Sequence, residues 1–146
     1  MQSITVDQFI AGLCAIPEEE FSVGTVHEYL KGNPVDERSL QPYLFFSKHR
    51  YTRNLIFKNR LFELLALCWD VGQSSQIHNH QDQNCWMAMP LGRLRVQNFR
   101  VFEQNGRTNY CRIEPTDAFD IHALMPAEVD PADPVHQVLN LPEFNL

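Results

Sequence analysis

His78 and His80 are the residues whose type and spacing most directly suggest chemistry. On a β-strand, residues two apart project to the same side, so both imidazoles could bind one metal ion. Neutral imidazole is a ligand that suits iron, zinc, copper and nickel. A bare pair of this kind is more often two surface or hydrogen-bonded histidines, so the surrounding residues must decide between the two interpretations.

The spacing around the pair favours a metal site. Gly72, five residues, His78-x-His80, four residues, position 85, six residues and Gly92 match the first cupin motif in every spacing. The one departure is Cys85, which stands where the general motif has Glu. This extended match is much more specific than the histidine pair alone, and it predicts a metal-binding cupin.

A third metal ligand is predicted from the C-terminal part of the chain. His136-Gln-Val-Leu-Asn140 has the His-x-x-x-Asn core of the second cupin motif and lies in an expected strand. His122 is the alternative, but it precedes a proline-rich stretch and is more typical of a surface or core histidine. We therefore favour His136 as the third ligand, and assign no role to His27 and His49.

Cysteine at position 85 changes what a metal in this site would attract. A centre with histidine ligands alone leaves the charge of a dication uncompensated by the protein, whereas a carboxylate ligand would partly neutralise it. Such a centre favours an anionic ligand from outside, above all a thiolate, and its open positions would admit both substrate and O₂. Ligand number does not exclude zinc, since three histidines and a water also form a catalytic zinc pattern.

Arg53 and Tyr51 lie on one face of an expected strand. An arginine that points inward from an apolar strand is costly unless it pairs with an anion. A guanidinium suits two-point binding of a carboxylate, and a tyrosine hydroxyl can add another donor. The alternative is a structural ion pair between Arg53 and one of the 18 acidic residues.

Several segments stand in one order along residues 42–140: Tyr51-Thr-Arg-Asn-Leu55, Leu67-Cys-Trp69, Ser75-Gln-Ile-His78-Asn-His80, Cys85 and His136-x-Val-x-Asn140. In this combination and order they closely resemble the cysteine dioxygenase family of thiol dioxygenases. The resemblance implies one non-haem Fe(2+) held by His78, His80 and His136. It implies that cysteine binds through thiolate and amine, with its carboxylate on Arg53 and Tyr51. Both atoms of O₂ would then be added to sulfur, giving cysteine sulfinic acid.

The resemblance also bears on Trp69, Arg53 and Cys85. Trp69 falls in a matching segment, and we assign it to the substrate site. Arg53 separates this pattern from that of the mercaptopropionate dioxygenases, which resemble it with Gln at the corresponding position. Cys85, counted with Arg53 and Tyr51 as a catalytic candidate, lies where many family members form a thioether with a tyrosine. Its alternative interpretation is a small, buried apolar residue.

Two other functions stay open on the sequence. One keeps the fold and oxidises another small thiol carboxylate such as 3-mercaptopropionate. The other is a non-catalytic cupin that binds metal. The chain ends at Leu146, without the later Ser-x-His-x-Tyr segment of the family, so we expect a barrel that lacks its last strands and has an exposed edge.

The elements that must position these residues are mainly strands. Residues 1–45 have helical periodicity, with a capping box at Thr5-Val-Asp-Gln8. Strands are expected over residues 51–57, 61–69, 85–89, 91–102, 108–113 and 135–139, with a turn at Asn105-Gly106 and a loop over 124–134. With the cupin motifs, this predicts a mainly-β cupin barrel (a double-stranded β-helix, or jelly roll) with an N-terminal helical segment. We expect a single domain over residues 1–146, with the barrel from residue 46.

Composition narrows the partners and the location. Twelve Lys and Arg against 18 Asp and Glu give a net charge of −6, so a basic surface for nucleic acid or a membrane is not expected. An apolar run of about 20 residues and a signal layout are both missing, and the cysteines have no disulfide-framework spacing, which favours the cytoplasm. We expect a monomer whose partners are L-cysteine and O₂.

Overall fold

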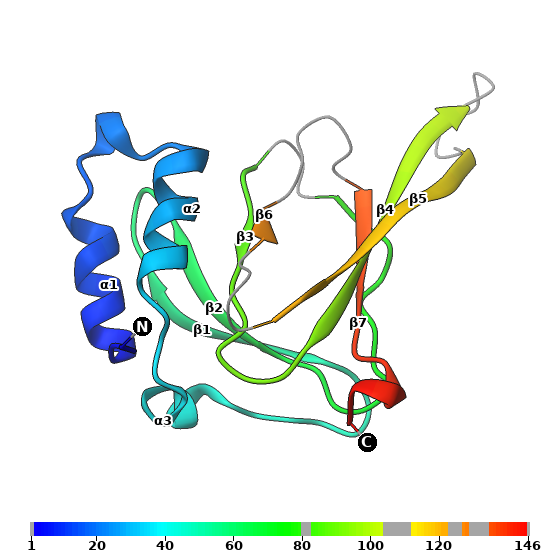
Figure 1. Cartoon of the computed structure of the whole chain (residues 1–146), viewed down its shortest axis with the longest axis horizontal. Coiled ribbons are helices and arrows are strands. Elements are labelled where there is room, and N and C mark those ends of the chain that lie inside the picture. Colours follow the sequence, from blue (N-terminus) through cyan, green and yellow to red (C-terminus); the bar gives the residue numbers. More distant parts are fainter. Residues whose placement is uncertain (1, 80–82, 104–111, 123–126, 129–134, 146) are drawn as a thin grey trace.

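Helices come first along the chain and strands follow, as the sequence predicts. The computed structural model describes residues 2–79, 83–103, 112–122, 127–128 and 135–145. The helices are α1 (Val6–Ala15), α2 (Val23–Gly32) and α3 (Glu37–Leu40), with short 3-10 turns at Glu18–Glu20, Gln41–Tyr43 and Pro142–Asn145. The strands are β1 (Thr52–Lys58), β2 (Glu63–Cys68), β3 (Trp86–Met87), β4 (Leu94–Glu103), β5 (Arg112–Ile121), β6 (Ala127–Glu128) and β7 (Val135–Leu139) (Figure 1). Within these residues, no helix is both long and apolar enough to cross a membrane.

The N-terminal helices pack beside β1 and β2 (Figure 1). Thr5 and Gln8 form the predicted capping box, each side chain accepting a hydrogen bond from the other residue's backbone N–H, so α1 begins where the sequence indicates. The apolar faces of α1 and α2 meet in a cluster of Phe9, Leu13 and Val26. Leu64 of β2, Trp86 of β3 and Phe62, which directly precedes β2, pack against this cluster. The Trp86 indole N–H also donates to the Val23 carbonyl at 3.0 Å, which joins β3 to α2.

The strands pair in antiparallel sheets. β1 pairs with β2, β3 with β6, and β4 lies between β5 and β7. A second core lies against the β5-β4-β7 sheet and consists of Leu94, Val96, Ile121 and Val138, with Trp69, Met87, Met89 and Phe119 packed around it. This arrangement confirms the predicted mainly-β fold with helices at its N-terminal end.

β5 differs most from the sequence prediction. The strand expected at residues 108–113 is observed as Arg112–Ile121, and its expected first residues, with the Asn105-Gly106 turn, fall outside the described part of the chain. Pro115 interrupts the strand pattern, so the sequence does not indicate that the strand continues beyond residue 113 to Ile121. It is tolerated because, among the described residues, β5 is bonded to β4 alone, so the missing N–H of proline breaks no second ladder there.

β6 falls inside the stretch 124–134, which the sequence predicts as a loop. Ala127 and Glu128 pair with Met87 and Trp86, so tertiary pairing gives a strand to residues whose local pattern does not indicate one. The rest of that stretch lies outside the described residues. The strand expected over residues 85–89 is shortened to β3, and the one over 61–69 to β2.

Candidate metal and substrate site

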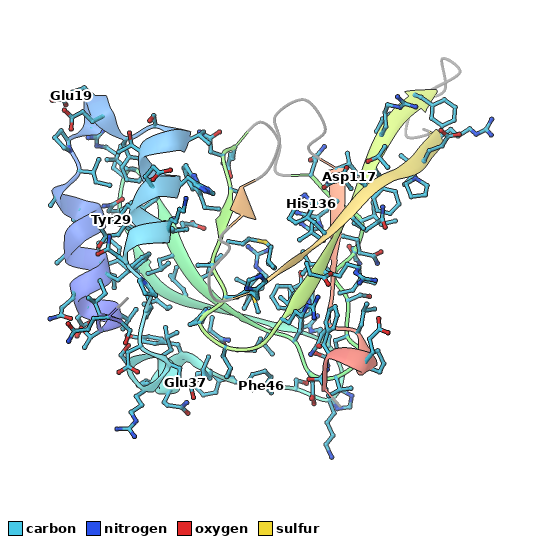
Figure 2. The ribbon with its side chains drawn as sticks, viewed as in Figure 1. Glu19, Tyr29, Glu37, Phe46, Asp117 and His136 are labelled. Atoms are coloured by element: carbon cyan, nitrogen blue, oxygen red, sulfur yellow. The ribbon has the colours of Figure 1, made fainter. Side chains whose placement is uncertain are left out.

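His78 and His136 face each other across two antiparallel backbone segments. The His78 N–H donates to the His136 carbonyl at 3.0 Å, and the His136 N–H donates back to the His78 carbonyl at 2.9 Å. Their ring centroids lie 4.6 Å apart at an interplanar angle of 64°. His136 projects from β7 (Figure 2). Only 4% of its surface is exposed. The two cupin motifs therefore bring one histidine each to the same place.

The segment from Gly72 to His78 reaches this place by bonding along β7. Gly72 turns the chain at a φ of +80°, and its N–H donates to the Asn140 carbonyl at 2.9 Å. The Ser75 N–H donates to the Val138 carbonyl at 2.8 Å, one step closer to the histidines. Because each bond fixes the register of the next, the backbone itself aligns His78 with His136.

A carbonyl oxygen fixes the proton position on the His78 ring. His78 Nδ1 lies 2.7 Å from the Gln76 carbonyl oxygen, which can only accept a hydrogen bond, so Nδ1 carries the proton. In the neutral ring the lone pair is then on Nε2, the usual arrangement for a metal-ligating histidine. The donor atoms here therefore fit a transition metal.

His80, the second predicted ligand, lies outside the described residues. Among those residues, no three His, Cys, Asp or Glu side chains are grouped closely enough to hold a metal ion. His122 follows β5 directly and is half-buried, and β4 separates β5 from the strand that carries His136. The observed pairing of His78 with His136 favours His136 over His122 as a ligand.

Tyr51 and Trp69 are brought together by the pairing of β1 with β2. Thr52 lies opposite Cys68, so the next residues along the two strands, Tyr51 and Trp69, approach each other. Their rings stack with centroids 5.0 Å apart and an interplanar angle of 9°. The Asn140 side-chain amide donates to the Trp69 carbonyl at 2.9 Å, which ties this corner to the end of the second cupin motif.

Arg53 lies opposite Leu67 on the same face of β1 and β2 as Leu55. The sequence predicts that this arginine points inward, but its side chain is exposed, and Leu55 and Leu67 on that face are 56% and 37% exposed. No acidic side chain in the described ranges forms an ion pair with Arg53, in contrast to Arg60, Arg93 and Arg95. Within the described residues, the structural ion pair that the sequence leaves open for Arg53 is therefore not observed.

Cys85 lies close enough to Arg53 for the two to interact electrostatically. Burial raises the pKa of the Cys85 thiol to about 11, and the positive charge of Arg53 offsets part of that effect. The thiol is therefore neutral at pH 7, which makes it a poor nucleophile by itself.

The segment that follows Cys85 alternates between two faces, as a strand should. Met87 and Met89 pack against the core of the β5-β4-β7 sheet, whereas Trp86 packs against the helices.

Comparison with known proteins identifies the family. The family model for cysteine dioxygenase type I matches residues 4–143. The chain belongs to the cysteine dioxygenase type I family. This confirms the family predicted from the motifs, and with it the cupin fold of this family of metalloenzymes.

Relatives of the family show how far the similarity extends. Cysteine dioxygenase type 1 of Bos taurus is 36% identical over 82 residues, which are 56% of this chain and 41% of the bovine protein. The Homo sapiens protein is 35% identical over 82 residues, which are likewise 56% of this chain and 41% of the human protein. Cysteine dioxygenase type 1 of Danio rerio is 30% identical over 101 residues, which are 68% of this chain and 50% of that protein. The chain thus spans half or less of the length of these relatives.

Two supporting contacts near the candidate site cannot be found by a search for ligand motifs. The Gln76 carbonyl is a backbone atom, so no residue type at position 76 signals that it holds His78. Asn140 is visible as the last residue of the second cupin motif, but its bond to Trp69 joins residues 71 positions apart. Only the closeness of the segments in the fold makes such contacts visible.

Proposed function

We propose that the chain is an iron-dependent thiol dioxygenase that converts L-cysteine and O₂ to cysteine sulfinic acid. The observation that carries this proposal is the pairing of His78 with His136, which joins the two cupin motifs at one point. His80 would complete the ligand set with them. When bound, Fe(2+) would supply a centre at which a thiolate and dioxygen can react together.

Arg53 and Tyr51 would recognise the carboxylate of cysteine. Arg53 has no ion-pair partner among the described residues, and a guanidinium can bind a carboxylate through two parallel hydrogen bonds. The Tyr51 ring is fixed against Trp69, which would hold its hydroxyl in place as a further donor. The positive charge of Arg53 supports a substrate with a carboxylate over a neutral thiol.

Cys85 would act near the substrate as a neutral thiol. Its raised pKa keeps the thiol protonated at pH 7 in the metal-free chain. The reaction adds both oxygen atoms to one sulfur, so it requires no external reductant.

We also propose that residues 1–146 form one domain, since Leu64 of β2 and the preceding Phe62 pack into the helical cluster. A cytoplasmic location and a monomeric state stay predictions.

The test is oxygen uptake by the iron-loaded chain with cysteine or 3-mercaptopropionate. We expect uptake with cysteine, with one sulfinic acid formed for each O₂ consumed and both oxygen atoms derived from labelled dioxygen. Faster oxygen uptake with 3-mercaptopropionate than with cysteine would show that 3-mercaptopropionate is the better substrate. Iron binding without oxygen uptake for either thiol would instead support a non-catalytic metal-binding cupin.

A further inference from the structure

The backbone ladder that carries His78 contains an irregular step just before the histidine. Gln76 and Ile77 lie between Ser75 and His78, whereas only Gln137 lies between their bonding partners, Val138 and His136. The extra residue makes this step a β-bulge, a feature that changes the direction of the side chains that follow. The direction of His78 therefore depends on what stabilises the bulge.

The Ser75 hydroxyl takes the place of a backbone group at this step. In a regular ladder the Val138 N–H would donate to the Ser75 carbonyl, but here it donates to Ser75 Oγ at 2.9 Å. The Ser75 carbonyl instead accepts from the Gln137 side chain at 3.0 Å. Ser75 is 3% exposed, so water cannot replace its hydroxyl without a change in the packing.

The same hydroxyl reaches the carbonyl that holds His78. Ser75 Oγ donates to the Gln76 carbonyl at 3.0 Å, and that oxygen also accepts from His78 Nδ1 at 2.7 Å. A continuous set of hydrogen bonds thus runs from the Val138 N–H through Ser75 and Gln76 to the His78 ring. Each bond fixes the group that orients the next.

We infer that Ser75 is a positioning residue for the metal site: its hydroxyl closes the bulge, orients the Gln76 carbonyl, and so sets the direction and the proton position of the His78 ring. This inference rests on the metal site of the proposed function. It assigns to Ser75 a role that the ligand motifs do not contain, and it requires no contact between Ser75 and metal or substrate.

The first measurement uses the metal-free chain. NMR of isotope-labelled histidine reports which ring nitrogen carries the proton. We expect the Nδ1–H form of His78 in the wild type and a mixture of both forms in Ser75→Ala. Ser75→Thr, which keeps the hydroxyl, should restore the wild-type form. Ser74→Ala, an exposed neighbour on the same ladder, is the matched control and should leave His78 unchanged.

The second measurement is the affinity for Co²⁺, used as a spectroscopic substitute for iron. Loss of a hydrogen bond that orients a ligand typically weakens metal binding by about 10–100-fold, and we expect Ser75→Ala to lie near the lower end. Leu13→Ala, which weakens the helical cluster rather than the core that contains Val138, separates this effect from general loss of stability. If Ser75→Ala does not fold, Ser75→Cys, with a thiol of similar size and poorer hydrogen bonding, takes its place.

Unchanged His78 protonation and Co²⁺ affinity in the folded Ser75 variant would overturn the inference. So would an equal loss of affinity in Leu13→Ala at matched stability. The two proposals can fail separately. If the wild-type chain binds neither Fe(2+) nor Co²⁺, the proposed function fails, whereas the NMR measurement still decides the role of Ser75.

Discussion

The proposed metal side of the site, formed by His78 and His136, is held in a very different way from the proposed carboxylate side, formed by Tyr51 and Arg53. On the metal side, the backbones of His78 and His136 are hydrogen-bonded to each other, and the Gln76 carbonyl accepts a hydrogen bond from the His78 ring. His136 is 4% exposed. On the carboxylate side, Arg53 is exposed on an open face whose Leu55 is 56% exposed. The first side is ordered by folding, whereas the second contains an exposed arginine that has no ion-pair partner among the described residues.

This difference separates the expected effects of mutation. Where folding has already ordered a metal-binding side chain, its replacement removes a preformed interaction. The residues around such a side chain contribute both to the stability of the fold and to the affinity for metal. Where a side chain is exposed, its replacement hardly changes the free energy of unfolding, because surface substitutions usually remain within about 0.5 kcal/mol. Its effect appears only when the partner binds.

The largest effect is expected for His136→Ala. Removal of a metal ligand should lower metal affinity by more than the about 10–100-fold that is typical of supporting residues, and abolish turnover. Metal content after dialysis and oxygen uptake measure both. His122→Ala is the control and should keep metal and activity. The opposite result, with metal lost in His122→Ala and kept in His136→Ala, would show that His136 is not the third ligand.

Arg53→Ala should act on substrate binding without loss of stability. A substrate carboxylate left without its partner costs about 2–5 kcal/mol, and we expect most of it as a raised KM for cysteine. Lys58→Ala, an exposed cation on the same strand, is the control and should leave KM unchanged. Cysteamine, which lacks the carboxylate, should be a poor substrate of the wild type, and equal turnover of the two thiols would contradict the assignment.

The raised pKa of Cys85 leads us to expect that the protein is less stable at alkaline pH. This pKa is raised from the ordinary value of 9.0 to about 11, so in that interval the unfolded chain has lost a proton that the folded chain retains. The free energy of unfolding therefore falls as the pH rises from 9 to 11, by about 2 kcal/mol for a shift of this size. Denaturant unfolding at several pH values measures this. Cys85→Ala should flatten the dependence, and an unchanged slope would exclude Cys85 as its source.

The smallest effect is expected for the ring pair that links the two sides. Trp69 is bonded through its carbonyl to Asn140 and stacked through its ring on Tyr51. A double-mutant cycle with Tyr51→Leu and Trp69→Leu should give a coupling of about 0.5–1.5 kcal/mol in the free energy of unfolding. A coupling near zero would show that the stack does not fix Tyr51.

Local patterns were sufficient for the elements whose residues interact with near neighbours. The capping box at Thr5 and Gln8 and the alternation of β7 each depend on residues a few positions apart, and both are observed. β5 and β6 could not be predicted in the same way. Pro115 is acceptable because β5 lies at the edge of the sheet that the described residues form, and Ala127 and Glu128 become a strand because β3 lies beside them.

The sequence by itself determined the family, the fold class and the candidate residues, because motif spacing records which residue types must recur at fixed intervals. Only the tertiary structure decided that His78 meets His136, that Arg53 is without an acidic partner in the described residues, and that Ser75 closes a bulge beside the metal side. The physical reason is that these relations join segments about 60 residues apart, or depend on the absence of a neighbour in space. Such relations exist only after the backbone ladder between residues 72–78 and β7 has formed.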